Sequence, residues 1–193
     1  MITVFAQSGI GRTQDEASRK MRSLVRQGKR LGLLRIVNGG FGGEHGLLED
    51  FREELTHSGG QYLSLDFARC EGKSLAESVL EELAPASTRY PLRYLPLIRS
   101  ESPFMQRAIT WQRLCDRLIE DEEPSRPTLL VIENFEQADE QTRCDVERLI
   151  HFHITHNIRR TFLLAIQNED HEFLRPSLSR LVNSCIVCCT QNG

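Results

Sequence analysis

The feature that most constrains the fold of this chain is a glycine-dense turn between two apolar segments. Residues 33–37 are apolar apart from Arg35, and the next nine residues, 38–46, include five glycines. After the turn, apolar side chains recur at helical spacing, at Leu47, Leu48, Phe51 and Leu55. A short apolar run is typical of a buried strand, and the later spacing is typical of a helix. The segment therefore predicts a strand, a tight turn and a helix in that order.

The same order builds the phosphate loop of nucleotide-binding proteins, whose pattern is G-x-x-x-x-G-K-[ST]. In such loops, backbone N–H groups and the helix N-terminus surround phosphate oxygens. In this chain Glu44 stands at the lysine position and His45 at the Ser/Thr position. A carboxylate there would repel a triphosphate, and a neutral imidazole cannot replace a hydroxyl on Mg²⁺, so we expect ATP or ADP with Mg²⁺ to bind weakly or not at all. The candidate nucleotide-binding residues of the turn are Asn38, Gly39, Gly40, Gly42, Gly43, Glu44, His45 and Gly46.

Composition sets outer limits on what the chain can be. The 193 residues suffice for one domain with a sizeable core, and 39% of them are hydrophobic. A net charge of −3 argues against a wholesale nucleic-acid binder. No apolar run approaches a membrane span, and the N-terminus lacks a signal-peptide pattern. The six cysteines are not spaced as a disulfide framework, so we expect a protein of the reducing cytoplasm that does not enter membranes.

Apolar periodicity predicts further strands and helices in alternation. We expect strands at 61–67, within 128–136, at 161–166 and at 184–189, and helices at about 47–56, 74–83, 104–120, 140–156 and 173–181. The stretch 84–103 has repeated prolines and little periodicity, which is typical of a connector or insertion. The continuous apolar run before Glu133 is typical of a strand buried on both faces of a parallel sheet. The alternation predicts a doubly wound α/β fold with a mainly parallel, five-stranded sheet.

A basic helix is predicted ahead of the first strand. Thr13 and Glu16 have the spacing of a capping box, so Thr13 is the expected N-cap, and Gly28 and Gly32 are expected to close the helix. Its predicted apolar stripe consists of Ala17, Met21, Leu24 and Val25. Its basic residues are Arg19, Lys20, Arg22, Arg26, Lys29 and Arg30. This surface is either a solvated helix face or a contact for DNA or another anion.

Several short motifs, in order along residues 11–189, resemble those of the AAA+ ATPase core, and more loosely its STAND and origin-initiator or clamp-loader relatives. Gly11 and Arg12 resemble the box that precedes the first strand, and residues 130–134 resemble a Walker B strand. Residues 176–181 resemble the segment that carries an arginine finger, and Gln167 or Asn168 lies where these families place their sensor-1 residue. The glycine turn is also similar to loops in ATP-binding proteins of BREX-type phage-exclusion loci.

The resemblance implies roles for residues near the turn. In a hydrolysing relative, the first Walker B acid orients Mg²⁺ and the following glutamate polarises the attacking water. Glu133 and Asn134 occupy these positions, and an amide cannot accept a proton from water. We therefore expect no efficient ATP hydrolysis by this chain alone. Arg180 stands at the position of an arginine finger, which acts on the nucleotide of a neighbouring subunit; alternatively, it caps a helix C-terminus or pairs with a surface acid.

These observations lead to three hypotheses about function. Residues 1–193 are expected to form a single P-loop NTPase-like domain, with the basic helix in 1–32 and the α/β core in 33–189, and without the helical lid of these families. The first hypothesis is a regulatory or scaffold subunit that assembles with an active ATPase subunit or with copies of itself. The second is a divergent ATPase active only in an oligomer, with Arg180 as its arginine finger. The third is a DNA-associated adaptor that uses the basic helix at 19–30.

Two other kinds of site do not fit the sequence. On a helix, His151 and His153 point about 160° apart, and on a strand Cys185 and Cys188 fall on opposite faces, so we predict no metal site. A dinucleotide-binding G-x-G-x-x-G pattern fails because His45 stands where its last glycine would be.

Overall fold

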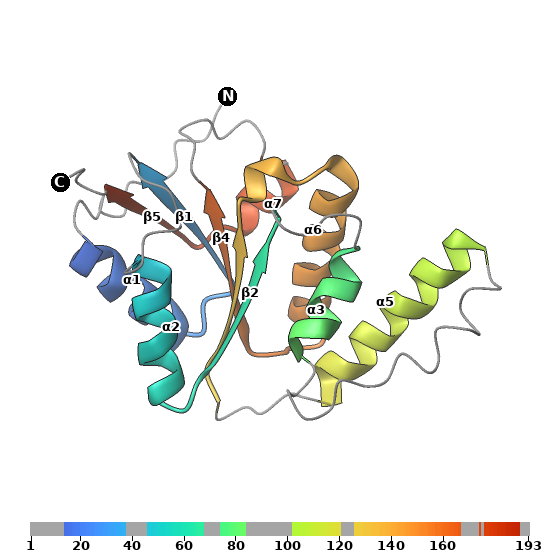
Figure 1. Ribbon diagram of the computed structural model, residues 1–193, viewed down its shortest axis with the longest axis horizontal. Helices are drawn as coiled ribbons and strands as arrows, with labels where there is room; N and C mark the ends of the chain where they lie inside the picture. Colours follow the sequence, from blue (N-terminus) through green and yellow to red (C-terminus); the bar gives the residue numbers. More distant parts are fainter. Residues whose placement is uncertain are drawn as a thin grey trace.

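The computed structural model of the chain describes residues 14–37, 46–67, 74–83, 102–120, 126–166, 174 and 176–189. The strands are β1 (Leu31–Val37), β2 (Gln61–Asp66), β3 (Thr128–Glu133), β4 (Arg160–Ile166) and β5 (Ser184–Cys189). The helices are α1 (Gln14–Arg26), α2 (Leu47–His57), α3 (Leu75–Leu83), α5 (Pro103–Glu120), α6 (Glu140–Thr155) and α7 (Pro176–Leu181), and a 3₁₀ helix, η1 (Phe135–Gln137), follows β3. The predicted alternation of strands and helices is confirmed (Figure 1). Residues 84–101 of the predicted connector, and the predicted N-cap Thr13, lie outside the described residues.

The five strands form one sheet in the order β2-β3-β4-β1-β5, and every neighbouring pair is parallel. In the centre, Leu33 of β1 lies opposite Leu164 of β4 and Cys185 of β5. Nearer the edge, Asp66 at the end of β2 lies opposite Glu133 at the end of β3. The predicted α/β fold with a parallel five-stranded sheet is therefore confirmed, and the sheet is parallel throughout.

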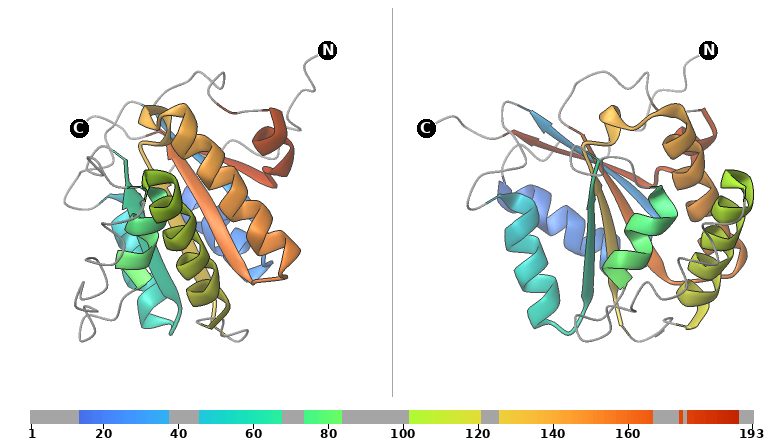
Figure 2. Two further views of the ribbon diagram at one scale, coloured as in Figure 1. Left: turned by 90° about the vertical axis from the view of Figure 1, so that its right-hand side faces the viewer. Right: turned by 45° about the vertical axis from the view of Figure 1, so that its right-hand side comes forward.

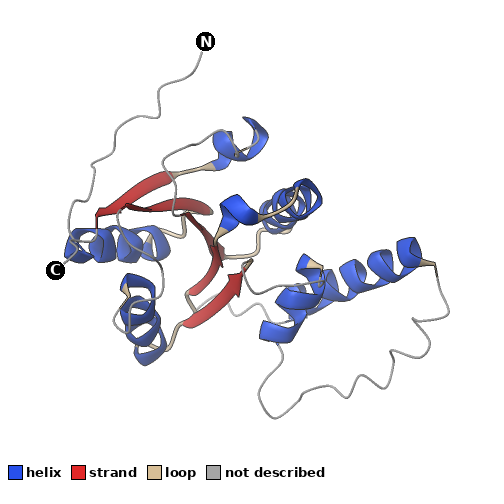
Figure 3. Ribbon diagram, turned by 45° about the horizontal axis from the view of Figure 1, so that its top comes forward, coloured by secondary structure: helices blue, strands red, loops and turns tan. Residues whose placement is uncertain are grey.

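Helices cover both faces of the sheet. On one face, α1 and α2 pack on the strands through Met21, Leu24 and Phe51. On the other face, α3, α5, α6 and α7 enclose a larger apolar cluster that includes Val79, Leu114 and other buried side chains. Figure 2 shows the two helix layers on opposite sides of the sheet, and Figure 3 shows α5 on the outside of its layer, beside α3. Each residue of β4 is buried, as expected for a central strand between two layers.

Three helices end in the same Schellman arrangement. In α1, the N–H of Gly28 bonds to the carbonyl of Val25, and the next N–H bonds to the carbonyl of Leu24. This arrangement requires a left-handed residue just after the helix. Gly28 has a φ of +60°, and Gly59 after α2 and Asn157 after α6 have φ of +81° and +54°. The ends of these helices are thus set by residues that tolerate a positive φ.

One predicted boundary is wrong. Gly32, expected between the first helix and the first strand, lies inside β1, which begins at Leu31. A Cβ atom at Gly32 would lie 2.7 Å from Cδ2 of Leu24, so α1 packs closely on β1 there and an added methyl group would displace the leucine side chain. The strand predicted within 128–136 is present as β3 and ends at Glu133, because Asn134 takes a left-handed conformation and η1 follows. Within the described ranges, no helix has both the length and the apolar character needed to cross a membrane.

Candidate functional site at the carboxyl edge of the sheet

The order of the strands creates a topological switch point at the carboxyl edge of the sheet. The connection after β1 runs through α2 on one face toward β2, whereas the connection after β4 runs through α7 on the other face toward β5. β1 and β4 are neighbours in the sheet, and the helices that follow them, α2 and α7, pack on opposite faces. In open α/β sheets, ligands bind outside the carboxyl ends of the strands at such a switch point.

The predicted glycine turn connects elements at this switch point. Val37 is the last residue of β1, and Gly46 precedes α2 directly. The carbonyl of Gly46 accepts hydrogen bonds from the N–H groups of Glu49 and Asp50, at 2.9 and 3.1 Å, so the helix begins at once. Of the predicted binding residues, only Gly46 is described. Those that lie outside the described residues are Arg12, Asn38, Gly39, Gly40, Gly42, Gly43, Glu44, His45 and Asn168.

Glu133 ends β3 and points to the face of the sheet that α1 and α2 cover. Successive side chains of a strand point to opposite faces of the sheet, so Glu133 shares a face with Val131, two residues earlier. Val131 packs in the apolar cluster of α1 and α2. The half-buried carboxylate accepts a hydrogen bond, through Oε1, from the hydroxyl of Ser64 on β2. The side chain therefore lies on the same face as α2, the helix that follows the glycine turn.

Asn134, at the position of the catalytic glutamate in the families that the sequence resembles, is bonded to the neighbouring strand. It is 7% exposed, and its Nδ2 donates a hydrogen bond of 2.6 Å to Oδ1 of Asp66, the last residue of β2. Its φ of +53° lies in the left-handed region, which asparagine tolerates better than most residues. Asn134 thus both turns the chain into η1 and joins the ends of β2 and β3. Its amide cannot act as a general base.

A row of polar side chains runs along β2 on this same face. Tyr62, Ser64 and Asp66 alternate with the buried Leu63 and Leu65, which face the opposite cluster. Burial raises the pKa of the Tyr62 phenol well above its usual range, and the negative charge of Glu133 adds to this effect. Tyr62 therefore stays protonated, and the carboxylates of Asp66 and Glu133 are the acidic groups at this end of the two strands.

These two carboxylates bear on whether a magnesium nucleotide fits. Carboxylate oxygens are ligands that Mg²⁺ accepts, commonly one or two beside the phosphates. Asp66 and Glu133 supply that type of ligand, although one oxygen of each already accepts a hydrogen bond, from Asn134 and Ser64. The described residues therefore fit the cation in part. At position 134, however, the side chain is an amide, which cannot abstract a proton from water.

Arg180 lies on α7, a short helix held to the core by Leu178. The arginine side chain is exposed, and no hydrogen bond or ion pair joins it to another residue in the described part of the chain. Figure 1 shows α7 beside the carboxyl ends of the strands. Arg180, at the end of α7, therefore lies at the surface near the switch point and is not engaged in a hydrogen bond or ion pair with another described residue.

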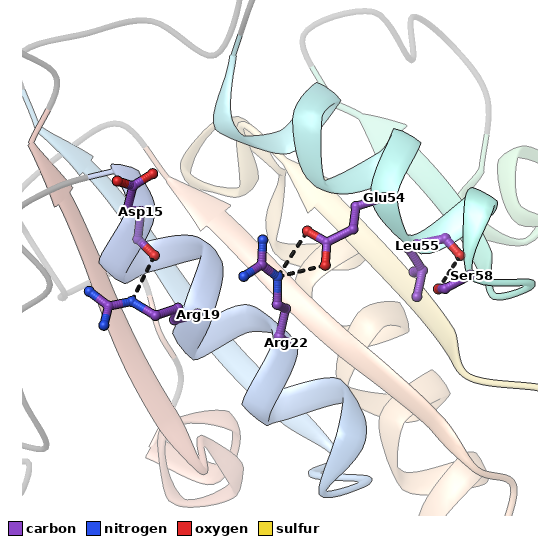
Figure 4. Close-up of polar contacts among 6 residues, drawn as sticks. All are labelled: Asp15, Arg19, Arg22, Glu54, Leu55 and Ser58. Atoms are coloured by element: carbon purple, nitrogen blue, oxygen red, sulfur yellow. Dashed lines mark hydrogen bonds and ion pairs between the residues drawn. The ribbon is translucent and has the colours of Figure 1, made fainter.

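The basic residues of the predicted helix 19–30 have different environments. Arg22 donates from Nε to the carboxylate of Glu54 on α2, with distances of 2.6 and 2.9 Å to its two oxygens (Figure 4). Lys20 pairs with Glu16 of its own helix at 3.2 Å. Arg30 is structural, since its Nη2 donates to Oδ1 of Asn157 at 3.0 Å and its Nη1 to the carbonyl of Ile158. The predicted basic surface that could contact DNA or another anion is therefore limited to part of α1.

The residues weighed as metal ligands are held apart in the structure. His153 is buried, whereas His151, two residues earlier on α6, is exposed. Cys185 packs in the cluster on one face of the sheet and Cys188 in the cluster on the other. The predicted opposite orientation of each pair is confirmed. In the ranges that the structure describes, no group of three or more His, Cys, Asp or Glu side chains could hold a metal ion.

Sequence reasoning missed three residues on this face of β2: Tyr62, Ser64 and Asp66, of which Asp66 lies at the carboxyl edge. The available signal was Asp66 itself, an acid that ends an alternating strand just as Glu133 ends the strand at 128–133. Recognising its role requires knowing that β2 and β3 are neighbours with Asp66 opposite Glu133, and this register is a property of the folded sheet.

The five-stranded, all-parallel sheet with helices on both faces is consistent with a P-loop, AAA+-like fold. Comparison with solved structures agrees with this assignment. The chain is similar to a Drosophila ORC structure bound to DNA, with a TM-score of 0.55 and 15% identity over 92% of this chain and 90% of that one. It is also similar to a Drosophila ORC structure bound to poly(dA/dT) DNA and Cdc6, with a TM-score of 0.60 and 11% identity over 92% of this chain and 29% of that one.

A third similar structure is that of a DNA replication initiation factor, with a TM-score of 0.50 and 12% identity over 92% of this chain and 49% of that one. No protein-family model matches the sequence, and no curated protein matches it at a significant level. At these identities the likeness concerns the fold, and the chain spans only part of the length of the second and third structures.

Proposed function

We propose that this chain is a catalytically degenerate P-loop subunit that has a regulatory or scaffold role in a larger ATP-dependent assembly. The observation that carries the proposal is the hydrogen bond from Asn134 to Asp66, because it engages the residue that stands where the resembling families carry their catalytic glutamate. The sequence adds Glu44 and His45 at the lysine and Ser/Thr positions of the loop. Lysine, hydroxyl and base would all be replaced, and each is central to phosphoryl transfer in this class.

Nucleotide binding and compartment follow as parts of the same proposal. Asp66 and Glu133 favour a magnesium nucleotide at the switch point, whereas Glu44 opposes a triphosphate, so we expect weak binding of ATP or ADP at most. Residues 1–193 form a single domain in this proposal, supported by the packing of α1 in one apolar cluster with β1 and α2. Cys115, Cys144, Cys185 and Cys188 are thiols rather than disulfides, which agrees with a reducing cytoplasm.

The test is to measure ATP binding and phosphate release by the purified chain. Titration calorimetry with ATP and Mg²⁺ should detect weak binding or none, and phosphate release should equal that of buffer. Steady phosphate release accompanied by tight ATP binding would overturn the proposal. Asn134→Glu is an informative variant, because it restores a carboxylate at the position of the catalytic base. It should still release no phosphate, since residues 44 and 45 are unchanged.

A second candidate function is a divergent ATPase that is active only as an oligomer. The exposure of Arg180 favours it, because an arginine finger must reach the nucleotide of a neighbouring subunit. Phosphate release should then rise more steeply than protein concentration, and Arg180→Ala should lower it by about 10³-fold or more. Arg113→Ala is the matched control, since it removes the same charge from an exposed site on α5. Equal effects of the two variants would exclude the finger.

The DNA-associated function is the third candidate. Two of the similar structures contain DNA, and α1 carries exposed arginines. Its test concerns the surface of α1 rather than the carboxyl edge of the sheet.

A further inference from the structure

A basic groove lies between α1 and α2, on the face of the molecule away from α3 and α5. Its volume is about 400 Å³, and it is lined by Arg19, Arg22, Ser23, Arg26, Gln27 and Glu54. Four of these residues come from α1, at the spacing i, i+3, i+4 and i+7, which forms one stripe of a helix, and Gln27 follows the helix directly. The apolar stripe of the same helix faces the sheet, so the groove residues are directed outward.

Two of the arginines are held in place through their Nε atoms. Arg22 donates from Nε to Glu54, and Arg19 donates from Nε to the carbonyl of Asp15 at 3.4 Å (Figure 4). Within the described ranges, neither arginine uses its terminal Nη groups in a hydrogen bond. Each guanidinium therefore keeps the pair of N–H donors that binds phosphate in a bidentate way.

The charge of the groove is positive although the chain is negative overall. Three guanidinium groups face one carboxylate, and that carboxylate is paired with Arg22. Arg26 is exposed and makes no hydrogen bond or ion pair with another described residue. The neutral side chains of the groove, Ser23 and Gln27, are joined by a 2.7 Å hydrogen bond from Nε2 of Gln27 to Oγ of Ser23. Arginine, serine and glutamine are all common donors to phosphate oxygens.

We propose that this groove binds the phosphodiester backbone of a nucleic acid, without regard to base sequence. Arg19 and Arg26 are seven residues apart on α1, which corresponds to about 10 Å along the helix axis. One strand of a duplex presents a phosphate about every 3.4 Å along its axis, so the row is long enough to reach more than one phosphate. A single free phosphate could contact only one end of the row. The inference rests on the DNA-associated candidate function. It does not depend on whether the carboxyl edge of the sheet binds a nucleotide.

The test uses the whole chain and a fluorescently labelled 20-base-pair duplex of random sequence, with an RNA duplex of equal length as a second probe. Affinity is measured by anisotropy at several salt concentrations between about 50 and 200 mM. The variants are Arg19→Ala, Arg26→Ala and the double variant, with Arg113→Ala on α5 as the control for charge. Thermal unfolding of each variant checks that the fold is kept.

We expect the wild-type chain to bind at low salt, and log affinity to fall linearly with log salt concentration. Each arginine that contacts one phosphate contributes about 0.9 to that slope, so the double variant should lower it by about two and weaken binding at 0.1 M salt by tens of fold. Arg113→Ala should change affinity by less than about twofold. Glu54→Gln should tighten binding several fold, because it removes the negative charge and keeps an acceptor for Arg22.

Three results would overturn the inference. The first is no binding of either duplex at 50 mM salt. The second is a double variant that binds like Arg113→Ala. The third is displacement of the duplex by polyglutamate at equal charge concentration, which would assign the groove to an acidic protein segment. Because none of these measurements involves ATP, they are separate from the phosphate-release tests of the proposed function.

Discussion

The side-chain amide of Asn134 donates a 2.6 Å hydrogen bond to the carboxylate of Asp66, although the two residues are 68 positions apart in the sequence. The pair joins the carboxyl ends of β2 and β3 at the edge where the glycine turn enters the fold. An acid at position 134 would place two carboxylates in contact. The pairing therefore explains in structural terms why an amide stands there.

Exchanging the two side chains tests this pairing. Asn134→Asp keeps a residue that tolerates the left-handed backbone but sets two carboxylates against each other, so we expect a loss of about 1–3 kcal/mol in the free energy of unfolding at pH 7. The double variant Asp66→Asn with Asn134→Asp restores one amide and one carboxylate and should recover most of that loss. Urea unfolding of the four proteins in a double-mutant cycle measures the coupling. A single variant as stable as the wild type would show that the hydrogen bond contributes nothing.

Buried His153 should make stability depend on pH. Its Nδ1 hydrogen-bonds to the carbonyl of Leu149 at 2.8 Å, and burial, reinforced by the positive charges of Arg160 and Arg30, lowers its pKa to about 3. The folded protein thus keeps this imidazole neutral while the unfolded chain takes up a proton below about pH 6.5. Stability is fully present above pH 6.5 and is lost as the pH falls toward 3. Between pH 7.5 and 5, this one group should lower the free energy of unfolding by about 2 kcal/mol.

The variant His153→Leu isolates this effect from other titrating groups. It replaces the imidazole by an apolar side chain, so the stability difference between pH 7.5 and 5 should shrink by about 2 kcal/mol. His151→Leu is the control, because His151 lies on the same helix and is exposed. If both variants keep the pH dependence of the wild type, His153 is not the buried base that the structure indicates.

Arg30 should contribute to stability, whereas Arg26, four residues earlier, should not. Arg30 donates to Asn157 and to the carbonyl of Ile158 in the turn that ends α6. Arg30→Ala removes both bonds and should cost about 1–3 kcal/mol in urea unfolding. Arg26→Ala should change stability by less than about 0.5 kcal/mol, since the side chain is exposed. Equal stability of the two variants would contradict the structural assignment of Arg30.

The contact between Gly32 and Leu24 predicts a crowding effect. A Cβ atom at position 32 would lie 2.7 Å from Cδ2 of Leu24 and 3.0 Å from Cδ1 of Leu163, and both leucines are buried. Gly32→Ala should therefore cost about 1–3 kcal/mol through overpacking. Combining it with Leu24→Ala should cost less than the sum of the single variants, because the added methyl group then fills part of the space. Strict additivity in thermal or urea unfolding would argue against the contact.

Part of the candidate site could be predicted because its signals are local. The residues just before Glu133 are apolar without interruption, which is typical of a strand buried on both faces. β3 is buried in this way. The strand-to-helix junction at the glycine turn follows from a change of apolar period between 33–37 and 47–55. The hydrogen-bond partners of Glu133 and Asn134 could not be predicted. These partners, Ser64 and Asp66, lie on β2, and the contacts depend on the register of β2 with β3.

The sequence by itself determined the alternation of strands and helices and the α/β class, since apolar periodicity acts over a few residues and needs no distant partner. The tertiary structure alone decided the strand order β2-β3-β4-β1-β5 and the contacts that follow from it. Strand order depends on how each crossover packs against the sheet, and hydrogen bonds such as Arg22 to Glu54 or Arg30 to Asn157 form only once segments distant in sequence have docked.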